Sequence, residues 1–321
     1  MPSCHTVERV SAVHPQIQAI IDEDAAEAAE AEPGPPSLES IRAGYLQTAI
    51  ELGGAPEPVA SAEDVVIARA DGGGVPARVY RPIAPAAPLG TLVWFHGGGW
   101  IAGDLDGFDR VARQLANASG ALCVSVDYRL APEHPFPAAL EDAHAALAWA
   151  GGAGATQLGS APDRVVVGGD SAGGHLAALA VQRARDRVRA QMHVYPALDP
   201  ACGSDAYRTY ADGPMLTVAD MRACWAAYLA VEDAAGAGDA AARPIDGDLA
   251  GLPPAFIAVA EHDPLRDDGL AYAAALRAAG VDVETALYDT MTHGFVRWGG
   301  IVEQAHELIA RIGQATRSSI A

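Results

Sequence analysis

Lysine is missing from this sequence, and all 21 basic residues are arginine. They are outnumbered by 41 acidic residues, which gives a formal net charge of −20 at pH 7. Such a net field repels polyanions, and no run of arginines forms a local basic patch that could offset it. We therefore expect no nucleic-acid partner and no attraction to an anionic bilayer.

Cysteine and long apolar runs are also scarce. The four cysteines are far apart and form no CxxC pair, which indicates free thiols and argues against a disulfide framework or a metal site. No uninterrupted apolar run approaches the roughly 18 residues that a membrane span needs. The N-terminal region is acidic and lacks the pattern of a signal peptide, so we expect a cytoplasmic protein. The cysteines are Cys4, Cys123, Cys202 and Cys224.

Hydrophobic residues make up 50% of the sequence, enough to bury a sizeable core. From residue 91 onward, short apolar runs alternate with helix-forming stretches, which predicts βαβ units and a parallel sheet covered on both faces. The expected strands are Thr91–Phe95, Ala121–Val126, Arg164–Val167, Met192–Tyr195, Phe256–Ala260 and Glu284–Tyr288. The expected helices are 106–119, 137–150, 172–188, 265–279 and 301–315.

Two regions depart from this alternation. Before it, the sequence predicts two helices and then an antiparallel hairpin around the turn Asp71–Gly74. Within it, residues 203–247 contain an expected helix near 217–230 but no strand, which indicates an insertion above the sheet. The helices expected first are 14–31 and 37–52, and the hairpin strands are Val65–Ala70 and Ala77–Tyr80.

The segment Gly169-Asp170-Ser171-Ala172-Gly173 follows an expected strand and opens an expected helix. A serine at such a sharp turn is strained and exposed, and small residues two positions before and after it avoid a Cβ clash. The helix N-terminus behind it favours developing negative charge. GxSxG arises by chance in glycine-rich sequences, but the strand–turn–helix setting favours Ser171 as a nucleophile.

A second glycine-rich segment, His96-Gly97-Gly98-Gly99-Trp100, also follows an expected strand. Attack on a carbonyl puts negative charge on its oxygen, which needs preorganised N–H donors. Glycines let backbone amides approach such an oxygen, together with the amide of Ala172. A phosphate-binding loop is the alternative, but the spacing fits neither GxGxxG nor a P-loop.

A nucleophilic serine needs a base and an acid that orients the base. His293 follows the last expected strand, at the edge of a parallel sheet where ligands bind, and Asp263 follows the strand before it. The chain order Ser, Asp, His is that of the α/β-hydrolase triad. Rival bases are His134, His175 and His262, and rival acids are Glu261 and Asp267.

These motifs resemble those of the bacterial hormone-sensitive-lipase-like esterases, a branch of the α/β-hydrolase superfamily, from about residue 60 to the C-terminus. The resemblance implies a mostly parallel eight-stranded sheet, flanked by helices, with a helical cap. It divides the chain into N-terminal cap helices (1–55), a first core part (56–202), a cap insertion (203–247) and a second core part (248–321). The motifs are His96–Trp100, Asp127–Ala138, Gly168–Gly174, Asp263–Asp267 and His293–Phe295.

The resemblance also implies a mechanism without metal or organic cofactor. Ser171 is the expected nucleophile, Asp263 the orienting acid and His293 the base. The expected oxyanion donors are the amides of Gly98, Gly99 and Ala172, with Gly97 and Gly98 as the other candidate pair. The implied partner is a small-molecule ester with a short or medium acyl chain, and a homodimer through the sheet edge is suggested.

Candidate pocket residues come from the cap and from the core, although each of them could instead only pack. They are Trp100, Met215, Leu216, Trp225, Tyr228 and Phe295. Two other functions remain open. The same triad serves amidases, deacetylases and lactonases, and some proteins with this fold bind small molecules without turning them over.

Overall fold

The computed structural model describes residues 11–30, 36–231 and 242–321. Its centre is an eight-stranded sheet of order β1-β2-β4-β3-β5-β6-β7-β8. Neighbours from β4 to β8 are parallel, whereas β2 is antiparallel to both β1 and β4, so the predicted mostly parallel sheet is confirmed. The strands are β1 (Ser61–Ala68), β2 (Gly74–Arg81), β3 (Thr91–Phe95), β4 (Leu122–Val126), β5 (Val165–Asp170), β6 (Val188–Val194), β7 (Ala255–His262) and β8 (Val283–Thr292).

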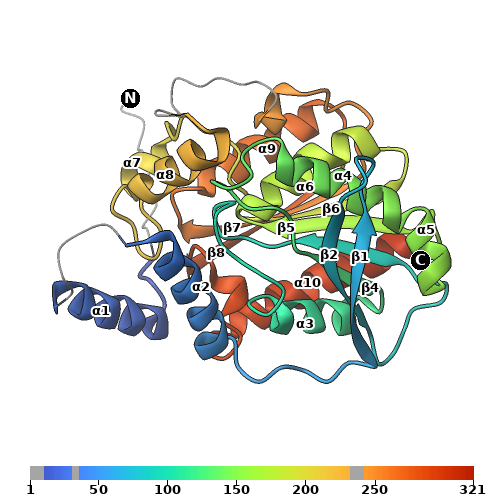
Figure 1. Ribbon diagram of the computed structural model, residues 1–321. Coiled ribbons are helices and arrows are strands. Elements are labelled where there is room, and N and C mark those ends of the chain that lie inside the picture. Colours follow the sequence, from blue (N-terminus) through green and yellow to red (C-terminus); the bar gives the residue numbers. More distant parts are fainter. Residues whose placement is uncertain (1–10, 31–35, 232–241) are drawn as a thin grey trace, which may run out of the picture.

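Helices cover both faces of the sheet (Figure 1). One face is covered by α3 (Asp109–Ser119) and α10 (Glu303–Ile320), and the other by α4 (Ala138–Ala150), α6 (Ala172–Ala184) and α9 (Arg266–Ala278). Within the described ranges, no helix combines the length and apolar character needed to cross a membrane. The remaining helices are α1 (Pro15–Glu30), α2 (Leu38–Leu52), α5 (Ala153–Leu158), α7 (Asp205–Thr209), α8 (Val218–Leu229) and the short 3-10 helices η2 (Pro244–Asp246) and η3 (Phe295–Arg297).

The core consists of two apolar layers, one on each face of the sheet. In β3, Val93 and Phe95 join the layer beneath α4 and α6, whereas Leu92 and Trp94 join the layer beneath α3 and α10. Successive side chains of a strand point to opposite faces, so a strand covered on both sides must be apolar throughout. This is why the central strands appear in the sequence as continuous apolar runs.

Helices α2 and α8 both border the carboxyl end of the sheet, where their side chains line one cavity. Helix α2 is fastened there by Arg42, whose guanidinium forms hydrogen bonds of 2.8 and 2.7 Å with Glu133. Arg42 Nε also donates to the carbonyl of Ile101, directly after the glycine-rich segment, at 2.8 Å. The division into core and cap stays a prediction, and residues 1–10, 31–35 and 232–241 of its cap parts lie outside the described residues.

Element boundaries differ from the predictions in a few places. The helix expected over 172–188 ends at Ala184, because Val188 already pairs with Val165 as the first residue of β6. Helices α5 and α7 were not predicted, since each is only one or two turns long. Cys123, Cys202 and Cys224 are free thiols, as expected, and Cys4 lies outside the described residues.

The turn that carries Ser171 is packed tightly against the end of β3. Ser171 has φ 54° and ψ −120°, a sparsely populated conformation for a residue with a side chain. A Cβ on Gly173 would lie closer than 3.0 Å to the carbonyl of Phe95, and one on Gly169 would meet the backbone of Gly173 equally closely. Glycine at both positions therefore lets the strand and the helix approach at this turn.

We predict that Gly173→Ala lowers the free energy of unfolding by about 3 kcal/mol, because the added methyl group collides with backbone that cannot rotate away. For a chain of this size, the thermal midpoint should fall by roughly 5–10 °C, measured by scanning calorimetry. Gly44→Ala is the matched control: nothing lies within 4 Å of a Cβ at this exposed position of α2, so stability should hold or rise slightly. Equal midpoints for the two variants would contradict this packing.

His175 on α6 is fully buried, and its Nε2 donates to the carbonyl of Ala242 at 2.7 Å. Burial lowers the pKa of His175 to about 4, because the charged imidazolium is poorly solvated inside the protein. In the unfolded chain the pKa of histidine is near 6.5. As the pH falls below about 6.5, the unfolded chain takes up a proton that the folded chain refuses, so stability is lost on acidification.

We predict that His175→Gln, which cannot titrate, costs less stability in acid than at neutral pH. The difference in unfolding free energy between wild type and variant should shrink by about 2 kcal/mol between pH 7.5 and pH 5. Thermal denaturation of both proteins at the two pH values measures it. A difference independent of pH would show that His175 is not held neutral by burial.

Candidate active site

Ser171, His293 and Asp263 come together at the carboxyl ends of β5, β8 and β7. His293 Nε2 lies 2.9 Å from Ser171 Oγ, and His293 Nδ1 lies 2.8 Å from Asp263 Oδ2. Asp263 is fully buried and Ser171 is 6% exposed. Parallel strands bring loops that are distant in sequence to one edge of the sheet, which is how these residues meet.

The hydrogen bonds fix which nitrogen of His293 carries the proton. An ionised carboxylate only accepts, so Nδ1–H donates to Asp263 and Nε2 is left to accept from the Ser171 hydroxyl. The second oxygen of Asp263 accepts from the amide of Leu265 at 2.8 Å, which holds the carboxylate in place. This is the arrangement in which a serine can pass its proton to an imidazole.

The glycine-rich segment lies beside the serine, and its backbone amides are not equivalent. Gly97 N–H donates to Asp170 Oδ1 at 3.1 Å and is therefore already occupied. For Gly98 and Gly99, no amide hydrogen bond to another described residue is present, and Ala172 is the first residue of α6, whose amide has no partner within the helix. Gly98, at φ 124°, adopts a backbone conformation that suits only glycine.

His96 braces this loop. Its ring stacks on Tyr128 at 4.4 Å between centroids, its Nδ1 lies 2.8 Å from the carbonyl of Gly97, and Tyr128 donates to the carbonyl of His96 at 2.7 Å. Burial lowers the pKa of His96 to about 4, so the ring is neutral near pH 7. His96 thus orders the glycine segment and makes no contact with the serine hydroxyl.

The rival acids have other partners. Glu261 accepts from the backbone and hydroxyl of Ser11, and Asp267 accepts from the amide of Ala206. Among the rival bases, His175 contacts Ala242, and His262 packs against Tyr210. His134 is exposed. Of the candidates weighed from the sequence, only His293 and Asp263 reach Ser171 as a connected pair.

A cavity of about 410 Å³ opens over Ser171 and His293. Met215 and Leu216 line it, as proposed from the sequence, whereas Trp100, Trp225, Tyr228 and Phe295 do not. These four rings are fully buried: Trp100 stacks on Tyr228 at 4.6 Å and contacts Trp225 at 4.2 Å, and Phe295 packs on Tyr195 and Tyr288. They belong to the two apolar layers of the core.

Several lining residues were not predicted from the sequence, among them Tyr45, Asp170, Cys224 and Arg297. Asp170 stands within the serine motif, and burial raises its pKa to about 6. Cys224 lies so close to Gly99 that a side chain there would collide with its sulfur. Only Asp170 and Arg297, which lie next to or shortly after a catalytic candidate, carried a usable signal in the sequence.

Comparison with known proteins agrees with this geometry. A family model described as alpha/beta hydrolase fold matches residues 92–297. Carboxylesterase NlhH of Mycobacterium tuberculosis is 45% identical over 244 residues, covering 74% of this chain and 76% of that protein. Ethyl acetate hydrolase of Pseudomonas putida is 36% identical over 265 residues, covering 80% and 82%. An esterase structure from Pyrobaculum calidifontis has a TM-score of 0.85 at 36% identity and covers 96% of this chain and 100% of that one.

The family match spans more than half of the chain, and each of these proteins aligns over most of its own length. The sheet order, the sharp serine turn and the hydrogen-bonded Ser–His–Asp order agree with the match. The chain belongs to the hormone-sensitive-lipase-like branch of the α/β-hydrolase family.

Proposed function

We propose that this chain is a serine carboxylesterase that hydrolyses short- to medium-chain acyl esters through an acyl-enzyme intermediate. The observation that carries the proposal is the unbroken hydrogen-bonded chain from Ser171 through His293 to Asp263, below a cavity open to a small molecule. The relatives named carboxylesterase and ethyl acetate hydrolase support the same bond class.

In the first step, His293 Nε2 takes the hydroxyl proton of Ser171 as Oγ attacks the ester carbonyl carbon. The amides of Gly98, Gly99 and Ala172 are the proposed donors to the resulting oxyanion. Losing one such donor costs on the order of 3 kcal/mol of transition-state stabilisation. His293 then protonates the alcohol oxygen as the C–O bond breaks, which leaves the acyl group on Ser171.

In the second step, His293 removes a proton from a water molecule that attacks the acyl carbonyl, and the acid leaves as Ser171 recovers its proton. Asp263 keeps Nδ1 protonated and stabilises the imidazolium in both steps. Because Asp263 is fully buried and held by the Leu265 amide, its carboxylate needs little reorganisation during the reaction.

The two helical segments that border the cavity are the proposed cap. Ile41 and Tyr45 of α2 line the same cavity as Met221 and Cys224 of α8, and so does Leu216. A cavity of about 410 Å³ suits a small ester, since sites for small molecules span roughly 300–1,000 Å³. We therefore propose that these side chains limit acyl length.

Ser171→Ala should reduce kcat/KM for p-nitrophenyl butanoate by at least about 10⁴-fold, because the acyl-enzyme cannot form. The thermal midpoint should stay near the wild-type value, since the side chain is small and the hydrogen bond from the backbone N–H of residue 171 to the carbonyl of Val194 is kept. Hydrolysis assays at matched protein concentration measure kcat/KM, and calorimetry measures the thermal midpoint as the folding control. Retained turnover in a folded variant would refute the assignment.

The bond class is tested with a panel of ethyl esters from C2 to C16, an N-ethyl amide and a lactone. We expect the highest kcat/KM between C2 and C8, and amide and lactone values at least tenfold lower. A preference for the amide or the lactone would keep the triad but replace the ester assignment. Absence of turnover together with absence of fluorophosphonate labelling of Ser171 would favour a receptor.

A further inference from the structure

We propose that the cavity over Ser171 contains a carboxylate-binding subsite formed by Arg297, so that the preferred esters carry a negative charge near the scissile bond. The inference rests on the proposed ester hydrolysis and adds the substrate class. It starts from one buried guanidinium that the triad mechanism does not use.

Arg297 ends η3, four residues after His293, and lines the cavity together with Ser171 and His293. Only 8% of the residue is exposed. A Cβ on Gly294, which also lines the cavity, would lie 3.9 Å from Arg297 Nη2. The guanidinium therefore lies beside the loop that carries the proposed base, and Arg297 borders the space that a substrate would enter.

The hydrogen-bonding capacity of Arg297 is largely unused. A guanidinium has five N–H donors, yet here Nη1 makes a long bond of 3.3 Å to the carbonyl of Tyr45, and Nε is buried without a partner. The Tyr45 ring lies 3.8 Å from the guanidinium carbon, which adds a cation–π contact but accepts no further hydrogen bond. Buried donors without partners are costly, so their presence calls for an explanation.

Arg297 also lacks a direct counter-ion. Among the described residues, no carboxylate oxygen lies within 4.0 Å of its guanidinium. Of the two acids that line the cavity, Asp170 lies near enough that the charge of Arg297 partly offsets the rise of its pKa on burial, but its hydrogen bond goes to the amide of Gly97 and not to the guanidinium. Asp220 caps α8 through Thr217. A buried charge is normally paired, and a planar guanidinium matches a carboxylate through two parallel hydrogen bonds.

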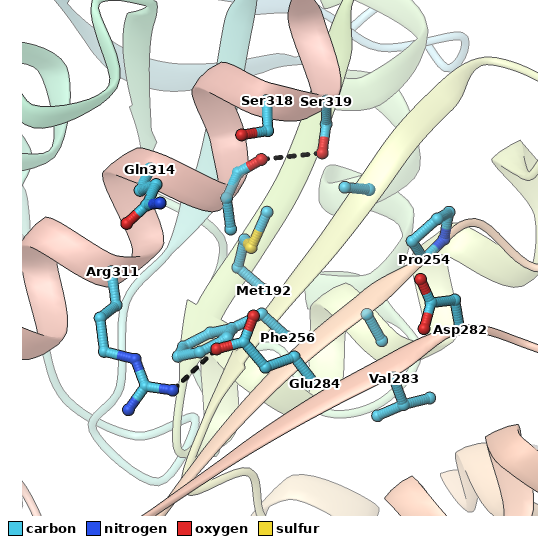
Figure 2. Close-up of a pocket in the computed structure, with 13 residues that line it drawn as sticks. Met192, Pro254, Phe256, Asp282, Val283, Glu284, Arg311, Gln314, Ser318 and Ser319 are labelled. Atoms are coloured by element: carbon cyan, nitrogen blue, oxygen red, sulfur yellow. Dashed lines mark hydrogen bonds and ion pairs between the residues drawn. The ribbon is translucent and has the colours of Figure 1, made fainter.

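Another arginine that lines a cavity shows the contrast. Arg311 borders a cavity of about 470 Å³ between α10 and the amino ends of β7 and β8 (Figure 2). Ser171 follows the carboxyl end of β5, at the opposite edge of the sheet. Arg311 Nη2 is paired with Glu284 at 2.7 Å, as the dashed line in Figure 2 marks. Arg311 thus has its anion within the protein, whereas Arg297 forms no ion pair with a described residue and lines the cavity where an ester would bind.

The test compares anionic esters with neutral isosteres. Ethyl hydrogen succinate against ethyl 4-oxopentanoate places the carboxylate on the acyl chain, and carboxymethyl butanoate against 2-oxopropyl butanoate places it on the alcohol. In each pair a carboxylate replaces a methyl ketone. The quantity compared is kcat/KM for the anionic ester divided by kcat/KM for its neutral isostere. For at least one pair, Arg297→Met should lower this ratio by about 10- to 100-fold. Any effect of the substitution that is the same for both esters cancels in the ratio.

Arg311→Met is the matched control and should leave both ratios within twofold of wild type, because it removes a charge outside the site. Ratios unchanged by Arg297→Met in both pairs would overturn the subsite and leave Arg297 as an anchor for Tyr45. Because wild type would still hydrolyse the neutral esters, that result is distinct from failure of the proposed function, in which no ester is hydrolysed.

A measurement on the wild-type protein covers the case in which Arg297→Met does not fold. Succinate should inhibit hydrolysis of ethyl butanoate competitively, at a concentration at least tenfold below that required of succinamide, which has the same shape without charge. Equal inhibition by the two compounds would overturn the proposal.

Discussion

The hydrogen bond between the buried carboxylate of Asp263 and His293 Nδ1 is the interaction on which the site depends. It fixes the tautomer that leaves Nε2 free to accept from Ser171, a residue 122 positions away in the sequence. The carboxylate can hold this position only because β7 and β8 are parallel neighbours, which brings the ends of both strands to one edge. The sheet order is thus a precondition of the chemistry.

The serine turn and the glycine-rich segment form one packed unit. Gly173 touches the carbonyl of Phe95 at the end of β3, and Asp170 accepts from the amide of Gly97. A shift of one loop would therefore move the other, so the position of the nucleophile relative to the candidate oxyanion donors stays fixed. The strained φ of 54° at Ser171 is maintained by this packing, since an isolated turn would relax.

Sequence reasoning predicted the sheet and the positions of Ser171, Asp263 and His293, because apolar runs and short motifs are local signals. It left open whether Trp100, Trp225, Tyr228 and Phe295 line the cavity or only pack, because the side of an element that faces a cavity depends on how distant segments pack; none of the four is among the lining residues. Arg297 stands close to His293 in the sequence, but its lack of a hydrogen-bond partner on Nε becomes visible only when its neighbours are known. The expected homodimer and cytoplasmic location stay predictions.

Covalent labelling with a fluorophosphonate tests the central claim most directly, because the reagent reacts with a serine that is activated by its histidine. We predict one adduct per chain by intact mass, located on Ser171 by peptide mapping, with a labelling rate at least about 100-fold lower in His293→Ala. Absence of labelling in the folded wild-type protein, or an adduct on another residue, would contradict the account.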